Sequence, residues 1–178
     1  MLALLLLTEA RRAARYDANG DFVPLDAQSP GDWDRAMIDE GRAVLDRAVA
    51  RLAGGPFQIK AAIHALHCED GETDWRQVLL LYTALLAHED SPVVRLNRAV
   101  ALAEAGYPGT ALAEIERLEP MLAEYQPYHA AAAEIRRRTG AAGSADESYR
   151  MAIALSRDGA EQVFLERQRA RAKKKAEH

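Results

Sequence analysis

A regular spacing between matching residues in the second half of the chain is the feature that most restricts its fold. Gly106 recurs as Gly140, and Thr110 recurs at the same spacing as the similar residue Ser144. Three further pairs keep this spacing: Ala99 and Ala133, Gly109 and Gly143, Ala111 and Ala145. A repeat period of about 34 residues is typical of helical hairpins that stack, because a single hairpin cannot bury both of its faces. The sequence therefore predicts an all-α fold built as an α-solenoid.

The paired residues have distinct expected roles in these two units. Glycine should end each first helix with a positive φ, which glycine adopts without steric cost. Thr110 and Ser144 should cap the second helices, and Ser144 with Glu147 has the spacing of a capping box. The matched alanines should allow the two helices of a unit to approach closely.

The two units resemble tetratricopeptide repeats. In the second unit, Tyr149 and Ala152 occupy the bulky and small packing positions of the second helix, whereas the first unit has Ile115 and Leu118. The resemblance implies a right-handed superhelix of antiparallel helix pairs. It is confined to the second half of the chain.

We expect about nine helices in the 178 residues, of which 49% are hydrophobic. They are predicted at 2–16, 33–52, 56–69, from 74, 92–106, 110–118, 121–139, 145–157 and from 159, the last one fraying into a basic tail. The strongest start signals are Asp74 with Gln77, and Ser91 before Pro92. One period further upstream, Glu72 and Gln77 stand where the repeat would have glycine and alanine. The two helices predicted at 56–69 and from 74 can still pair through a shifted connection.

Three parts follow from these elements. Residues 1–90 form an N-terminal helical part with an extended strap at 17–32, residues 91–157 form the two repeat-like helix pairs, and residues 158–178 form a capping helix and basic tail. The apolar, uncapped run from Met1 to Leu7 suggests a helix that begins earlier, in a longer chain.

Charge and cysteine content restrict the function. The formal net charge of −4 gives no electrostatic footprint for non-specific nucleic-acid binding. The basic run 167–175 is open to two interpretations: a local contact with nucleic acid or an acidic partner, or, more commonly, a solvated terminus. Cys68 is the only cysteine, which excludes an internal disulfide and fits a reducing compartment, so we expect a cytoplasmic protein.

No catalytic motif stands out, and we expect neither an enzyme nor a cofactor. The sequence has no nucleophile elbow, phosphate-binding glycine loop or dinucleotide fingerprint. One candidate for a metal site or a metal-dependent enzyme is the group of His64, His67 and Cys68, but no second ligand group has a suitable spacing. The favoured interpretation is that His67 packs between helices and Cys68 fills a small apolar space.

Two other polar groups are candidate binding sites. Asp17, Asn19 and Asp21, with Gly20 between them, look like the start of a calcium loop, but an Asx-turn that ends the first helix fits better. Arg95, Asn97 and Arg98 lie on the helix type that lines the concave groove of a solenoid, where they would contact an extended peptide. In the alternative, Asn97 bonds a neighbouring helix and the arginines are solvated. The equivalent residues of the next unit are His129, Ala131 and Ala132, so the pattern is not repeated.

Most of the chain up to Gly106 resembles the C-terminal extension of one group of extracytoplasmic-function sigma factors, which are bacterial transcription initiation subunits. The segments that carry the resemblance are 8–15, 33–41, 55–63, 73–75 and Ser91-Pro92-Val93-Val94-Arg95-Leu96-Asn97-Arg98-Ala99-Val100-Ala101. The signature residues are Asp17, Gly20, Asp21, Gln28, Trp33, Asp74, Trp75, Asn97 and Arg98. The strap keeps the glutamine and Trp-Asp of the family but loses its arginines, and the modules that bind polymerase and promoter are absent from these 178 residues.

The resemblance implies a regulatory or protein-interaction domain of a sigma factor that modulates transcription initiation. Its partners would be the sigma modules of the same polypeptide, RNA polymerase or a regulatory protein, with no direct DNA binding, no membrane and a possible homo-oligomer. The alternative is a free-standing peptide-binding scaffold.

Overall fold

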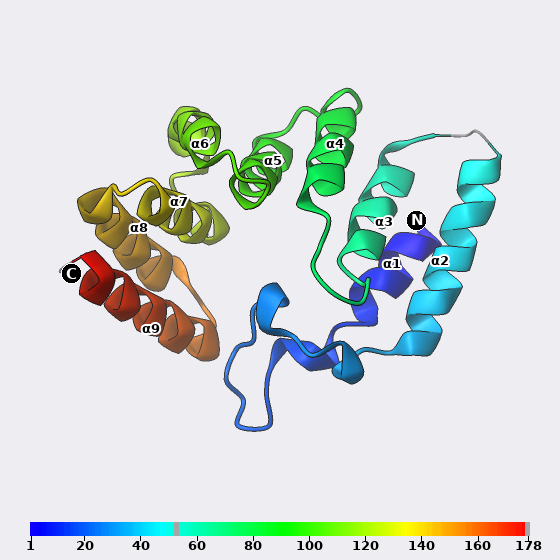
Figure 1. Cartoon of the computed structure of the whole chain (residues 1–178), viewed down its shortest axis with the longest axis horizontal. Coiled ribbons are helices and arrows are strands. Elements are labelled where there is room, and N and C mark those ends of the chain that lie inside the picture. Colours follow the sequence, from blue (N-terminus) through cyan, green and yellow to red (C-terminus); the bar gives the residue numbers. More distant parts are fainter. Residues whose placement is uncertain (52–53, 177–178) are drawn as a thin grey trace. The chain divides into compact units, whose positions relative to one another are not determined.

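The fold is all-α, as predicted (Figure 1). A computed structural model describes residues 1–51 and 54–176, and within them nine α-helices and three short 3-10 helices account for all of the regular secondary structure. Helices that follow one another in the chain pack as neighbouring pairs. None of the described helices is both long enough and apolar enough to cross a membrane.

The chain divides into two compact units, and each is described by itself. The first contains residues 1–19 and 23–94, and the second contains residues 20–22 and the chain from Arg95 onward. The helices up to the boundary are α1 (Leu2–Glu9), α2 (Arg35–Ala50), α3 (Pro56–Leu66), α4 (Trp75–Leu86) and α5 (Pro92–Glu104), which begins just before it. The loop after α1 contains η1 (Ala13–Arg15), η2 (Leu25–Ala27) and η3 (Pro30–Asp32). The others are α6 (Pro108–Leu122), α7 (Gln126–Arg138), α8 (Ala142–Leu155) and α9 (Gly159–Ala176).

The core of the first unit forms where α1 packs against α2 and α3. Leu7 and Ile38 are completely buried there, together with Ala61. Gly41 of α2 faces α1 so closely that a β-carbon on it would lie 2.8 Å from the Leu7 Cγ atom. The absence of a side chain at Gly41 therefore sets the distance between α1 and α2.

The first helix is shorter than the predicted range 2–16. It ends at Glu9 because the carbonyl of Ala10 accepts a hydrogen bond from the Asp34 N–H (2.9 Å) instead of continuing the helical ladder. The Arg12 N–H then donates to the Glu9 carbonyl (2.9 Å), a tighter turn that leads into η1. The next helix begins at Arg35 rather than Trp33, and the predicted end at Leu52 lies outside the described residues.

The repeat period is visible in the helices themselves. α5 begins at Pro92 and ends at Glu104, and α7 begins at Gln126 and ends at Arg138, so both ends of the two helices are separated by the same spacing as the matched glycines. Gly106 and Gly140 follow these helices with φ values of 94° and 81°, as predicted.

Both glycines belong to the same helix-ending turn. The N–H after each glycine reaches back to the helix: Tyr107 donates to the Leu102 carbonyl (2.8 Å) and Ala141 donates to the Arg136 carbonyl (2.9 Å). This is the Schellman arrangement, which satisfies carbonyls that the helix leaves unpaired. α3 and α4 also pair, and Gly71, with a φ of 102°, lies one position upstream of where the repeat period would place it. The shifted connection predicted for this pair is thus a small one.

The predicted caps of the second helices are wrong. α6 and α8 begin at Pro108 and Ala142, so Thr110 and Ser144 lie inside the first turn, and the N-cap residues Tyr107 and Ala141 make no side-chain cap bond. The carbonyl of Ser144 accepts from the Ser148 hydroxyl (2.8 Å) and no capping box forms with Glu147. Both helices begin immediately after the Schellman turn, which leaves no room for a loop as long as the one predicted.

Two further boundaries differ from the prediction. α6 continues through Pro120 to Leu122, and α7 begins at Gln126, where Pro127 occupies the first turn. Proline is common in the first turn of a helix, and in α7 that proline is Pro127 and not Pro120. α9 remains helical to Ala176 instead of fraying from Arg169, and the last two residues of the predicted tail lie outside the described residues.

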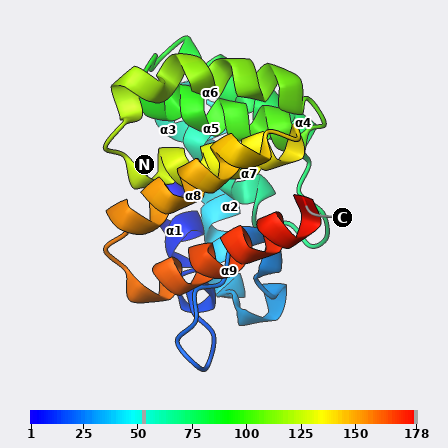
Figure 2. The same cartoon turned by 90° about the vertical axis from the view of Figure 1, so that its left-hand side faces the viewer.

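The second unit is held together by small and aromatic side chains. Tyr128 is completely buried and donates its hydroxyl to the Ile115 carbonyl (3.1 Å). Ala133, Tyr149 and Ala152 pack with Leu165, so α9 covers α8, as Figure 2 also shows. Tyr149 and Ala152 therefore occupy packing positions, as the repeat pattern predicts.

Candidate functional site

The candidate site of the first unit is a cleft around Trp33, with a volume of about 770 Å³. It lies between the end of α1, η1, the end of the loop and the start of α2. Its described lining consists of Glu9, Ala10, Arg12, Ala13, Arg15, Tyr16, Gly31, Asp32, Trp33, Asp34 and Met37. We refer to it as the Trp33 cleft.

Backbone hydrogen bonds hold the two sides of the Trp33 cleft together. The Asp34 N–H donates to the Ala10 carbonyl (2.9 Å), and the Val23 N–H donates to the Arg15 carbonyl (2.9 Å). The Asp34 carboxylate accepts from the Met37 N–H (3.0 Å) and caps α2. The loop is thus fixed to α1 and η1 before it enters α2.

Trp33 forms the floor of the cleft. Its side chain is only 8% exposed and belongs to the core cluster that contains Leu7 and Ile38. Its indole N–H is buried, and no acceptor for it exists in the part of the chain that the structure describes. The guanidinium of Arg35 lies 5.9 Å from the centre of the ring and is held by Asp70 at 2.6 Å. A buried donor without a partner costs free energy.

The rim of the cleft has charges of both signs. Glu9 and Arg12 form an exposed ion pair (2.9 Å), and Arg15, Asp32 and Asp34 add one cation and two carboxylates. The described lining contains no serine, threonine, cysteine or histidine side chain, and its ionisable groups are carboxylates, arginines and the Tyr16 phenol. The arrangement is suited to binding a polar segment.

A buried polar group lies in the core of the same unit. Burial, and next the charge of Arg11, lower the pKa of both His64 and His67 to about 4, so both imidazoles are neutral near pH 7. Burial also lowers the pKa of Arg11, whose Nε finds no acceptor among the described residues. His67 packs against Trp75 with ring centres 5.3 Å apart and ring planes tilted by 59°, and Cys68 is completely buried, its thiol 3.7 Å from the Leu7 carbonyl. The packing roles predicted for His67 and Cys68 are confirmed.

The described residues contain no group of three or more histidine, cysteine or acidic side chains placed to hold a metal ion. His64 and His67 are thus not joined by a third ligand in the part of the chain that the structure describes.

The predicted signature residues in and near the loop serve different purposes. Trp33 lines the cleft. Asp17 accepts from the Asn19 N–H (2.8 Å), so the predicted Asx-turn forms, but it does not end the first helix, which stops at Glu9; Gly20 follows with a φ of 80°. Asp21 belongs to the second unit, where it pairs with Arg167 (2.9 Å). Gln28 donates its amide to the Val23 carbonyl (3.3 Å) and braces the loop.

The other signature residues also have local roles. Asp74 caps α4 by accepting from the Gln77 N–H (3.0 Å), as predicted. Trp75, the first residue of α4, is half-buried against His67. The signature residues of the first unit therefore do not gather in one site, and Trp33 alone among them lines the cleft.

The proposed peptide-contacting residues differ in their exposure. Arg95 and Asn97 have exposed side chains on α5. Arg98 is half-buried and pairs with Glu114 of α6, so it holds two helices together instead of being solvated.

Sequence reasoning missed Arg12, Arg15 and Tyr16 as cleft residues. The sequence pattern assigns them to one continuous helix, in which they would share a face, and it does not show that the helix ends at Glu9 or that the segment 31–37 packs beside them. The exposed aromatic ring of Tyr16 next to a turn cluster was the available signal.

The Trp33 cleft lies in a segment that matches a protein family. Residues 1–49 match a family of unknown function, DUF6596, and every lining residue of the cleft falls within them. The chain is 41% identical over 171 residues to the "Uncharacterized protein R00370" of Rhizobium meliloti (strain 1021). The match covers 94% of this chain and 40% of that protein, so the chain spans about two fifths of the length of its curated relative. No solved structure matches the chain.

Proposed function

We propose that this chain is a protein-interaction domain of a bacterial RNA polymerase sigma factor and that it regulates transcription initiation without catalysing a reaction. The length of the Rhizobium relative gives the main support, because a match over 94% of this chain accounts for only 40% of that protein. The same sequence pattern is therefore one part of a longer polypeptide there. The larger, unmatched part of that protein leaves room for modules that bind polymerase and promoter.

The Trp33 cleft supports an interaction role. Two of the segments that resemble the sigma-factor extension, 8–15 and 33–41, supply most of the cleft lining. A fixed cleft with an aromatic side chain and a rim of mixed charge is suited to a polar protein segment. The bound segment would come from the sigma modules of the same polypeptide, from the polymerase or from a regulatory protein.

The charge balance argues against DNA as the main ligand. With 27 acidic and 23 basic side chains, the chain as a whole repels a long polyanion. We expect the isolated chain to leave the mobility of promoter DNA unchanged in a gel-shift assay. The proposal also places the chain in the cytoplasm, where transcription takes place.

Deletion in the Rhizobium relative tests the proposal. The segment that matches this chain is removed, and transcription by purified polymerase from promoters that the intact protein serves is compared with and without it. We expect transcript yield to change while the truncated protein still binds polymerase. An unchanged yield would reject the regulatory role, and failure of the intact protein to support any initiation would reject the sigma-factor assignment.

A second candidate, a free-standing peptide-binding scaffold, is favoured by the exposure of Arg95 and Asn97 on α5. It predicts that Asn97→Ala weakens capture of a peptide partner and leaves thermal unfolding unchanged. A lower melting temperature with unchanged capture would instead assign Asn97 to the stability of the unit.

A further inference from the structure

A cleft in the second unit collects an excess of positive charge. It has a volume of about 950 Å³ and lies between the end of α7, the start of α8 and the last turns of α9. Five cations and one carboxylate line it: Arg137, Arg138, Arg169, Lys173, Lys175 and Asp146. We call it the basic cleft. All of its described lining belongs to the second unit.

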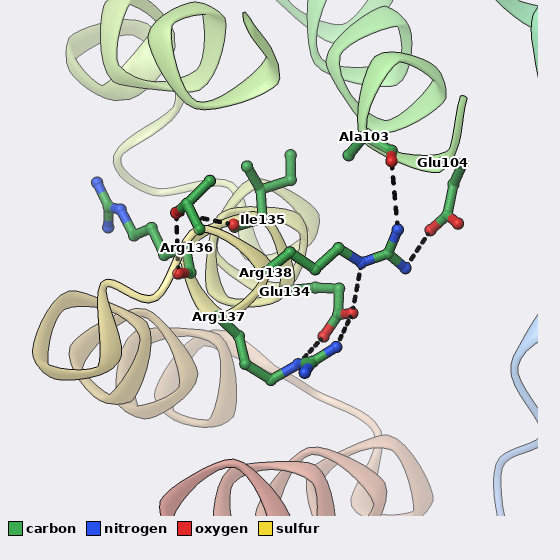
Figure 3. Close-up of polar contacts among 8 residues, drawn as sticks. Ala103, Glu104, Glu134, Ile135, Arg136, Arg137 and Arg138 are labelled. Atoms are coloured by element: carbon green, nitrogen blue, oxygen red, sulfur yellow. Dashed lines mark hydrogen bonds and ion pairs between the residues drawn. The ribbon is translucent and has the colours of Figure 1, made fainter. Parts of the chain in front are cut away.

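Carboxylates at the edge of the basic cleft fix two of its arginines in place (Figure 3). Arg137 forms two hydrogen bonds with Glu134 (2.8 and 2.6 Å). Arg138 pairs with Glu134 (2.8 Å) and with Glu104 (2.7 Å), and it also donates to the Ala103 carbonyl (3.4 Å) at the end of α5. Burial alone would raise the pKa of Glu134, but these arginine hydrogen bonds outweigh it and lower the pKa.

Asp146 organises the opposite wall. It accepts two hydrogen bonds from Arg169 (2.6 and 3.0 Å) and lies 3.3 Å from the Lys173 amine. The Arg169 hydrogen bonds, followed by that of Lys173, lower the pKa of Asp146 to about 2, so it stays charged. One carboxylate thus holds the last turns of α9 against α8.

These acids do not neutralise the cleft. Even when Glu104 and Glu134 are counted with Asp146, five cations face three carboxylates. Lys173 and Lys175 are exposed on the last turns of α9, where a ligand can reach them. Burial, and next the charge of Glu134, raise the pKa of Tyr149 to about 12, so this buried side chain adds no charge to the cleft.

The rest of the chain restricts the ligand to a short one. Of the 23 basic and 27 acidic side chains, five basic and one acidic line the basic cleft, which leaves 18 basic and 26 acidic side chains elsewhere, a net charge of −8. A long polyanion such as a nucleic acid would extend beyond the cleft and be repelled. A few acidic residues of a peptide fit a cleft of this volume, and three alanines in the lining (Ala142, Ala145 and Ala172) offer them apolar contact.

We propose that the basic cleft of α7, α8 and α9 binds a short acidic segment of a partner protein. The inference rests on the proposed interaction role and adds the chemistry of the partner. Carboxylates of the segment pair with Lys173 and Lys175, beside arginines that are already held in position.

Fluorescence anisotropy with the whole chain measures the binding of a fluorescein-labelled peptide of about six glutamates. A peptide of this length suits a pocket of this size. We expect binding that weakens as salt is added, and no binding of the matching glutamine peptide. The double variant Lys173→Gln/Lys175→Gln should weaken binding by about fivefold, as expected for two exposed ion pairs. Arg171→Gln is the matched control, because it removes one cation from the same stretch of α9 without changing the cleft lining.

Three outcomes would overturn the proposal: no binding of the glutamate peptide, an equal loss with Arg171→Gln, or tighter binding of a single-stranded oligonucleotide of equal charge. Far-UV circular dichroism checks that each variant is folded. Peptide binding combined with an unchanged transcript yield in the deletion experiment would reject the regulatory role and retain the acidic-segment site. A changed yield without peptide binding would do the reverse.

Discussion

At the scale of single residues, Gly41 is the tightest point of the first unit. A β-carbon there would lie 2.8 Å from the Cγ atom of Leu7, which is completely buried. Alanine gains about 1 kcal/mol over glycine inside a helix, whereas overpacking a core costs about 1–3 kcal/mol. The overpacking should dominate, because the contact involves a branch point of the leucine and not a flexible end.

We therefore expect Gly41→Ala to lower the free energy of unfolding by about 1 kcal/mol. Denaturant unfolding followed by tryptophan fluorescence measures it, since Trp33 and Trp75 are the only tryptophans and both belong to the first unit. In the background Leu7→Ala, the same substitution should cost nothing or become stabilising. A Gly41→Ala protein as stable as the parent would show that α1 and α2 can separate without loss.

The buried histidines make the first unit sensitive to acid. The pKa values of His64 and His67 are about 4 in the folded chain, against 6.5 for an ordinary histidine. The unfolded chain therefore binds more protons, and stability is lost as the pH falls from 6.5 towards 4. A shift of this size corresponds to about 3 kcal/mol for one histidine.

Replacing these histidines should flatten the pH dependence. We expect the variants His64→Gln and His67→Gln each to reduce the slope of unfolding free energy against pH between 6.5 and 4, whatever their stability at neutral pH. His88→Gln, at an exposed position of the same unit, serves as the control and should keep the parent slope. A parent protein whose stability does not change across this interval would contradict the assignment of buried neutral imidazoles.

At the scale of elements, the two repeats make opposite demands on their glycines. Gly106 and Gly140 have positive φ values in the Schellman turns, whereas Gly109 and Gly143 lie in the first turns of α6 and α8 with open space around the α-carbon. An alanine at the first pair is forced into a conformation that costs about 1–2 kcal/mol. At the second pair, an alanine gains up to about 1 kcal/mol of helix propensity.

We expect Gly106→Ala and Gly140→Ala to lower the melting temperature of the second unit, and Gly109→Ala and Gly143→Ala to leave it unchanged or raise it. Far-UV circular dichroism at neutral pH records each melting curve. The equivalent variants of the two repeats should behave alike, since the helices end in the same turn. A different sign for Gly106→Ala and Gly140→Ala would show that the repeats are not structurally equivalent.

Local signals account for the elements that the sequence predicted well. Asp74 and Ser91 cap the helices that follow them, with bonds to the Gln77 and Val94 N–H groups, because a cap involves residues that are close in the sequence. The end of α1 was not predictable in this way. It depends on the hydrogen bond between Asp34 and Ala10, which are distant in the sequence, and the Trp33 cleft depends on that same bond.

The ion pairs also depend on contacts between residues that are distant in the sequence, which local signals do not show. Arg138 and Glu104 occupy equivalent positions of the two repeats, yet their pairing was not foreseen, because a repeat period shows which positions correspond and not which side chains meet. Likewise, the sequence pattern of Arg169 to Lys175 is that of a fraying tail. The carboxylate that holds this end of α9 comes from Asp146, on another helix.

At the scale of the whole molecule, the two units should respond to acid in different pH ranges. The first unit loses stability between pH 6.5 and about 4, through His64 and His67. In the second unit, Asp146 has its pKa lowered to about 2 from 3.8, so the stability it contributes is complete above pH 3.8 and is lost only as the pH falls towards 2. Glu134 of the second unit, whose pKa is also lowered, adds a loss of stability only below its ordinary value of 4.5, so the two ranges meet near pH 4.

Tryptophan fluorescence reports on the first unit alone, whereas far-UV circular dichroism reports on the helices of both. We expect the fluorescence midpoint in denaturant to decrease as the pH falls from 6.5 to about 4, while part of the dichroism signal keeps a later transition. In the double variant His64→Gln/His67→Gln, the fluorescence midpoint should lose most of this pH dependence. If the two signals instead coincided at every pH, the chain would unfold as one cooperative body, and protonation of the buried histidines would then destabilise the repeats as strongly as the unit that contains them.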